Sequence, residues 1–245
     1  MTTRLLYIHV PKCGGTSLGS AVRLAYFHSQ ATISLRQTNQ VRNALYPAVG
    51  ETERDLRNQE IRQIMLAGLM ARKVKCVSAH VYYNARVHQE IDPERKVVTM
   101  LRDPVARFLS HYAYVKRNHP DPGHAKSLEA FLETEAAMRY GSTYLLYFAS
   151  TYQHVTQDLA ADMELARQNL SRFSVIGNLD RAGAYRTALR KLTGRPLLSW
   201  ERNKRPGRKP SSAKEIPAEL RARIEQICAP DIALYNFAQK LPSSV

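Results

Sequence analysis

The sequence predicts an α/β fold of three layers, in which helices flank a mainly parallel sheet of about four or five strands. Short apolar segments alternate with helical patterns along the chain, which is typical of a parallel sheet covered on both faces. No internal repeat or linker interrupts the alternation, so we expect one domain over residues 1–245. With 245 residues, 44% of them hydrophobic, the chain can bury a sizeable core.

The elements follow from hydrophobic periodicity and from the residues that begin and end each segment. We expect strands at residues 5–10, 74–79, 96–101 and 173–177. We expect helices at residues 17–28, 52–71, 104–117, 127–137, 140–150, 156–171, 180–193 and 217–239. Residues 30–50 have weak periodicity and are expected to form a loop or substrate-facing structure, and residues 202–214 form a basic loop.

The chain is strongly basic, with 36 Lys and Arg against 21 Asp and Glu and a formal net charge of +15. Such a chain attracts nucleic acids, nucleotides with several phosphates, or acidic glycans. Aromatic residues make up only 8% and do not alternate with basic ones, so we expect no nucleic-acid partner. A polyanion-binding protein without enzymatic activity stays an alternative.

The cysteines and the apolar segments indicate the compartment. Cys13, Cys76 and Cys228 are far apart and form no CxxC pattern, so they predict neither a metal site nor a disulfide framework. The apolar run at residues 5–10 is too short to cross a membrane. We therefore expect a cytoplasmic protein without an integral membrane segment.

A loop suited to anions follows the first strand. Glycines let backbone N–H groups approach an anion, and the N-terminus of the next helix adds positive potential, so the segment is P-loop-like. The predicted anion-binding residues are Lys12, Cys13, Gly14, Gly15, Thr16 and Ser17. The lysine precedes the glycines, the reverse of the Walker A order, and no magnesium-binding acid is evident. A small-molecule kinase that uses ATP is therefore a disfavoured alternative.

Arg102 and Ser110 form a second candidate anion site. Arg102 comes directly after the strand at residues 96–101, and α/β folds bind ligands at the carboxyl ends of their strands. Ser110 lies about two helical turns further along the following helix. A guanidinium group and a hydroxyl group can together bind one phosphate.

Both motifs resemble those of PAPS-dependent sulfotransferases, where PAPS is 3′-phosphoadenosine-5′-phosphosulfate. The first resembles the 5′-phosphosulfate loop PKTGGTSL of the carbohydrate branch, with Cys13 in place of threonine. The second resembles LRDPVxRFLSxY, which implies that Arg102 and Ser110 hold the 3′-phosphate. The resemblance spans residues 5–237. It implies a soluble, bacterial-type enzyme that needs no metal, transfers a sulfuryl group to a hydroxyl of a glycan or glycolipid, and releases PAP.

The same resemblance implies a histidine base. The segment Ser78 to Tyr83 resembles the one around the catalytic histidine of the uronyl 2-O-sulfotransferases, which implies that His80 accepts the acceptor's proton. Ser78 stands where some members have another histidine. Glu90 stays an alternative base, because other branches use glutamate.

Two further roles concern charge on the nucleotide. A lysine aimed at the oxygen that bridges sulfate and 5′-phosphate stabilises the negative charge that builds there, and we assign this role to Lys12. In the family, a basic loop near the C-terminus helps to cover the nucleotide. We therefore expect Lys204 or Arg205 to reach a phosphate, with a solvated loop as the alternative.

Overall fold

The computed structural model describes residues 3–118, 127–149, 158–197 and 216–245, apart from the side chains of residues 15–18 and 51–52. The described strands form one parallel sheet in the order β2-β3-β1-β4-β5. Their bounds are β1 (Leu5–Ile8), β2 (Gln30–Ile33), β3 (Cys76–Ala79), β4 (Lys96–Leu101) and β5 (Val175–Asn178). This sheet confirms the predicted fold class.

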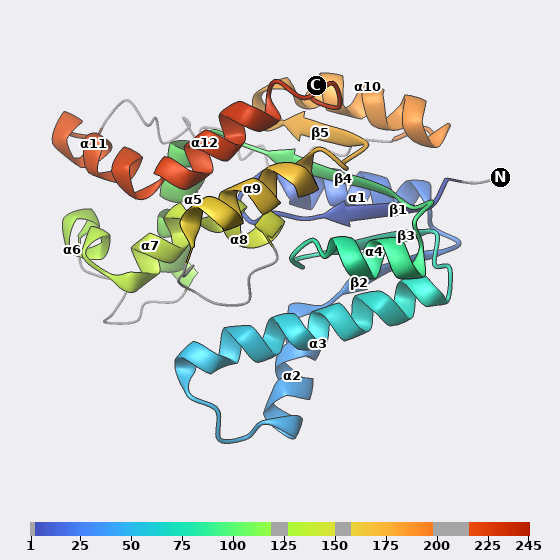
Figure 1. Ribbon diagram of the computed structural model, residues 1–245, viewed down its shortest axis with the longest axis horizontal. Coiled ribbons are helices and arrows are strands. Elements are labelled where there is room, and N and C mark those ends of the chain that lie inside the picture. The colour runs from blue at the N-terminus through green and yellow to red at the C-terminus, as the bar shows by residue number, and fades with distance from the viewer. Residues whose placement is uncertain (1–2, 119–126, 150–157, 198–215) are drawn as a thin grey trace.

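Helices cover both faces of the sheet (Figure 1). On one face, Tyr185 packs against Gly177 of β5. This face carries α1 (Gly15–Ala25) and α10 (Ala182–Thr193), and the other carries α3 (Glu51–Ala71), α4 (Ala85–Ile91), α8 (Thr143–Ala149) and α9 (Leu159–Leu170). Right-handed crossovers explain the division for the helices that join two strands, because connections that run toward β2 and toward β5 place their helices on opposite faces. α10 follows the last strand, so this rule does not apply to it.

The prediction of a loop at residues 30–50 is wrong, because this segment contains β2 and helix α2 (Leu35–Leu45). β2 lies at the edge of the sheet and only Ile33 is buried in it, so it lacks the apolar run of a central strand. Ser34 begins α2, since its hydroxyl oxygen accepts a hydrogen bond from the backbone N–H of Gln37 at 3.3 Å. The edge position thus accounts for the weak hydrophobic signal.

The single helix expected at residues 217–239 is two helices, α11 (Ala218–Ile227) and α12 (Ala229–Ala238). Pro230 lies in the first turn of α12, where a missing backbone N–H breaks no helical hydrogen bond. α12 packs against α8 and α9. The break at Cys228 therefore lets α12 turn back onto the helical layer over the sheet.

Short helices occupy the region between β4 and α8. They are α5 (Pro104–Asn118), α6 (Leu128–Leu132) and α7 (Glu135–Gly141). Together with α8, the described residues 127–149 hold three helices, where two were expected. Phe108 and Phe131 lie in an apolar cluster that joins α5, α6, α7 and α11. This cluster fixes α5 beside the end of β4.

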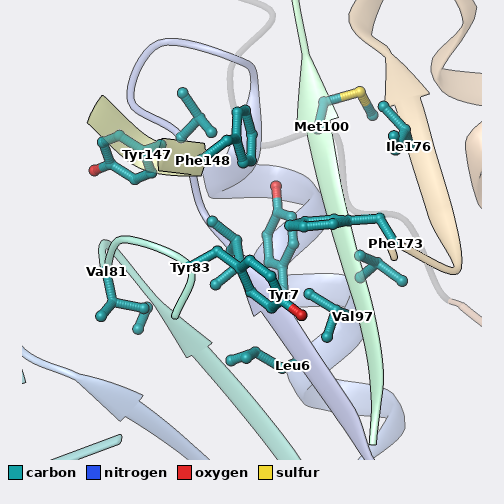
Figure 2. Packing of buried hydrophobic residues seen from close by; sticks show 14 of the residues in the cluster. Leu6, Tyr7, Val81, Tyr83, Val97, Met100, Tyr147, Phe148, Phe173 and Ile176 are labelled. Atoms are coloured by element: carbon teal, nitrogen blue, oxygen red, sulfur yellow. The ribbon is translucent and has the colours of Figure 1, made fainter. Parts of the chain in front are cut away.

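The main apolar core anchors α8 to the sheet. The rings of Tyr83 and Phe173 meet edge-on with centroids 5.0 Å apart, and Phe173 meets Phe148 of α8 in the same way at 5.5 Å (Figure 2). Such aromatic pairs add about 0.5–1.5 kcal/mol each beyond the area they bury. The position of α8 matters below, because this helix contacts both candidate anion sites.

Candidate active site

The carboxyl ends of three neighbouring strands carry the candidate residues. His9 follows β1, His80 follows β3, and Arg102 follows β4, with β1 between the other two strands. Parallel strands end at the same edge of a sheet, which is where α/β folds bind their ligands. The structure therefore places the two histidines and the arginine at one edge.

The loop between β1 and α1 has an unusual backbone. Lys12 and Gly14 both lie in the left-handed region, with φ of 65° and 73°. A Cβ atom at Gly14 would lie 2.3 Å from Leu179 Cδ1, so a larger residue there would displace Leu179. Gly14 is also the N-cap residue of α1 and has no side chain to cap the first turn. This geometry suits an anion at the helix N-terminus.

Lys12 lies between the ends of β4 and α5. Its Nζ atom is 4.2 Å from the centroid of the Tyr114 ring, and its carbonyl oxygen accepts a hydrogen bond from Arg102 Nη1 at 3.4 Å. Ser110 is one helical turn before Tyr114 on α5, so both residues share the face that meets Lys12. The structure thus brings Lys12, Arg102 and the Ser110 face of α5 together.

Cys13 points away from the loop's outer surface. Its side chain is fully buried, and Sγ lies 3.5 Å from the hydroxyl of Tyr144 and 3.6 Å from the carbonyl oxygen of Pro11. Burial raises the pKa of this thiol to about 11, so it is neutral at pH 7. The side chain of Cys13 therefore packs inward beneath the loop.

The two histidines form a stacked pair. The ring centroids of His9 and His80 are 4.0 Å apart, with an angle of 26° between the ring planes. Arg62 of α3 donates a hydrogen bond to the carbonyl oxygen of His80 at 3.2 Å. The Nδ1 atom of His80 is buried and has no hydrogen-bond partner among the described residues. A buried polar atom without a partner calls for an explanation, and a catalytic role or a bound water can supply one.

Burial keeps both imidazoles neutral. It lowers the pKa of His80 to about 4, with a further decrease from the charge of Arg62. It lowers the pKa of His9 to about 3, and positive charge on His80 acts in the same direction. At pH 7 each ring therefore has a nitrogen lone pair that can accept a proton.

Glu90, the alternative base, lies elsewhere. It is in the last turn of α4, is exposed, and accepts a hydrogen bond from Arg86 at 3.0 Å. Asp92, two residues further on, binds Arg4 at 2.7 Å, and Arg4 directly precedes β1. Glu90 is therefore near the amino edge of the sheet, away from Lys12 and Arg102.

Several candidate positions are outside the described structure. Lys204 and Arg205 fall within residues 198–215, and the side chains of Thr16 and Ser17 are also not described. Within the described ranges, no group of three or more His, Cys, Asp or Glu residues could hold a metal ion. None of the helices described is long and apolar enough to span a bilayer.

Comparison with known families decides the family of this chain. The family model described as "Sulfotransferase family" matches residues 2–238. The chain belongs to the sulfotransferase family. Sulfotransferases transfer sulfuryl groups, so the strand edge with Lys12, His80 and Arg102 is the candidate active site of an enzyme.

The fold of this sulfotransferase agrees with that of a solved bacterial structure. A crystal structure of a sulfotransferase from Alicyclobacillus acidocaldarius matches with a TM-score of 0.53 and 16% sequence identity. The match covers 96% of this chain and 94% of the other. At this identity the match supports the fold. No curated protein matches the sequence.

Three residues that contact the candidate site residues are absent from the sequence-based assignment. The stacking of His9 on His80 depends on β1 and β3 being neighbours, which no local pattern specifies. Tyr114 had a usable signal, since it lies one turn after Ser110 on the same helix face. Tyr144 had none, because it is 42 residues from Arg102.

Proposed function

We propose that this sulfotransferase uses PAPS and transfers its sulfuryl group to a hydroxyl group of a carbohydrate or glycoconjugate. The observation that carries the proposal is the joint placement of the two anion-binding motifs. Arg102 hydrogen-bonds to the backbone of Lys12, and Lys12 in turn contacts the face of α5 that carries Ser110. PAPS has a phosphate at each end of its ribose and so matches two adjacent anion sites.

The residues fit this substrate chemically. The first turn of α1 has no side-chain cap, so its backbone N–H groups can bind the 5′-phosphosulfate, and Gly14 permits the left-handed turn before it. Arg102 supplies a planar guanidinium group for the 3′-phosphate, and the hydroxyl of Ser110 supplies a further donor. The 3′-phosphate separates PAPS from ATP, so Arg102 and Ser110 favour a sulfotransferase substrate over that of a kinase.

In the proposed reaction, the acceptor oxygen forms a bond to sulfur while the bond from sulfur to the bridging phosphate oxygen breaks. His80 accepts the proton of the acceptor hydroxyl, for which its neutral ring is suited. Lys12 stabilises the negative charge that remains on the bridging oxygen of PAP. The products are the sulfate ester, PAP and a proton on His80, which passes to solvent.

The acceptor class rests on sequence resemblance and on charge. The loop and the His80 segment resemble those of carbohydrate sulfotransferases, and the net charge of +15 suits an acidic glycan or glycolipid. The proposal places the enzyme in the cytoplasm. The three cysteines support this location, since all of them are free and buried, as expected in a reducing compartment.

Calorimetric titration of the full chain tests the proposal. We expect PAP to bind without added metal and more tightly than ATP or AMP, and we expect Arg102→Ala to weaken PAP binding more than AMP binding. Preferential binding of ATP with magnesium would instead support a small-molecule kinase. Absence of binding to all three nucleotides would support a polyanion-binding protein and contradict the proposal.

A further inference from the structure

One buried hydroxyl group connects the two anion-binding motifs. Tyr144 of α8 is completely buried, and its hydroxyl oxygen accepts a hydrogen bond from the backbone N–H of Arg102 at 2.9 Å. The same hydroxyl donates to the carbonyl oxygen of Arg102 and lies 3.5 Å from Cys13 Sγ. Its hydrogen and its lone pairs are therefore directed at the backbone after β4 and at the loop after β1.

The backbone of Tyr144 is itself held from a distant part of the chain. Asp231 of α12 is completely buried and accepts hydrogen bonds from the N–H of Tyr144 at 2.8 and 2.9 Å and from that of Leu145 at 3.1 Å. Arg107 of α5 pairs with Asp231 at 3.4 Å. Helices α5, α8 and α12 therefore meet at one carboxyl group, which fixes the start of α8.

We propose that Tyr144 is a positioning residue that sets the distance between the Lys12–Gly14 loop and Arg102. This inference rests on the proposed function, since it assigns the two motifs to the two phosphates of one nucleotide. A ligand that engages both motifs gains from the second contact only when their spacing matches its own. Tyr144 contacts both motifs through its buried hydroxyl, so it is placed to set that spacing without touching the nucleotide.

The test compares ligands that carry one phosphate or both. Affinities for PAP, adenosine 5′-monophosphate and adenosine 3′-monophosphate are measured by calorimetry on the full wild-type chain and on Tyr144→Phe. Loss of the hydroxyl should weaken PAP binding about tenfold, which corresponds to about 1.4 kcal/mol and lies in the range for loss of a buried hydrogen bond. Each monophosphate should lose less than about threefold, because neither needs both motifs at once.

Tyr185→Phe is the matched control. Tyr185 is also fully buried, but its hydroxyl has no hydrogen-bond partner among the described residues. The same chemical change should therefore leave all three affinities at their wild-type values. A loss of PAP affinity in this variant as large as that in Tyr144→Phe would overturn the inference, because it would indicate a general effect of removing a core hydroxyl.

The remaining outcomes separate the inference from the proposed function. Wild-type protein that does not bind PAP contradicts the proposed function itself. If the wild-type protein binds PAP, two results for Tyr144→Phe would overturn the positioning role alone. One is an unchanged PAP affinity, and the other is an equal loss of affinity for all three ligands. If Tyr144→Phe does not fold, Cys13→Ala is tested instead, because it removes the contact between the Tyr144 hydroxyl and the loop. An unchanged PAP affinity in Cys13→Ala would also overturn the positioning role.

Discussion

The imidazole rings of His9 and His80 stack 4.0 Å apart at the carboxyl ends of adjacent parallel strands. The register pairs Ile8 with Ala79, so the residues that follow them, His9 and His80, lie side by side. Two positive charges at this distance repel strongly, which favours at most one proton on the pair. His80 therefore faces a neutral partner while it acts as the proposed base.

Replacing His80 separates catalysis from nucleotide binding. His80→Ala should lower kcat at least about 100-fold, the lower range for loss of a general base. PAP affinity should stay near wild type, since the proposed anion-binding motifs follow β1 and β4, whereas His80 follows β3. Rate assays and calorimetry on the same preparation measure both quantities. His28→Ala, at an exposed histidine between α1 and β2, is the control and should retain activity. Full activity in His80→Ala would contradict the base assignment.

The acidic limb of the pH–rate profile should lie well below the ordinary histidine range. Neutral His80 is the active form, and burial lowers its pKa from 6.5 to about 4. The base should therefore remain active as the pH falls through 6.5 and lose activity only near pH 4. Measurement of kcat/KM from pH 4 to 8 checks this. A limb centred near 6.5 would mean that another group, or an exposed histidine, accepts the proton.

Lys12→Ala should lower kcat more than it weakens PAP binding. Charge on the bridging oxygen is greatest in the transition state, so loss of the cation should cost about 100- to 1,000-fold in rate. Lys116→Ala is a matched control, because Lys116 lies over the Tyr112 ring on α5 at 5.5 Å. Its removal should leave kcat unchanged. An equal effect of both variants would indicate a general electrostatic contribution.

Gly14→Ala should impair both stability and nucleotide binding. The left-handed backbone costs a non-glycine residue about 1–2 kcal/mol, and the new methyl group would clash with Leu179. Gly194→Ala isolates the backbone strain, since Gly194 has φ of 65° and nothing within 4 Å of a built Cβ. Denaturant unfolding should therefore show a larger loss for Gly14→Ala. PAP affinity should fall in that variant alone, and equal PAP binding would contradict the role of the loop.

The central strands were predictable because their signals are local. Leu5 to Ile8 form a buried apolar run, although β1 ends two residues before the predicted end at residue 10. Pro104 marked the start of α5, where Asp103 accepts a hydrogen bond from the N–H of Ala106 at 2.8 Å. The edge strand β2 escaped prediction because an edge strand buries little of its surface.

The amino-acid sequence by itself determined the fold class and the strand–loop–helix order around the candidate anion-binding loop. Turn chemistry and hydrophobic periodicity act over a few residues, so they can be read directly. Only the tertiary structure decided that His9 stacks on His80, that Glu90 lies near the opposite edge, and that Tyr144 joins the two motifs. These contacts depend on strand order and on helix packing between distant segments, which leave no pattern in either segment alone.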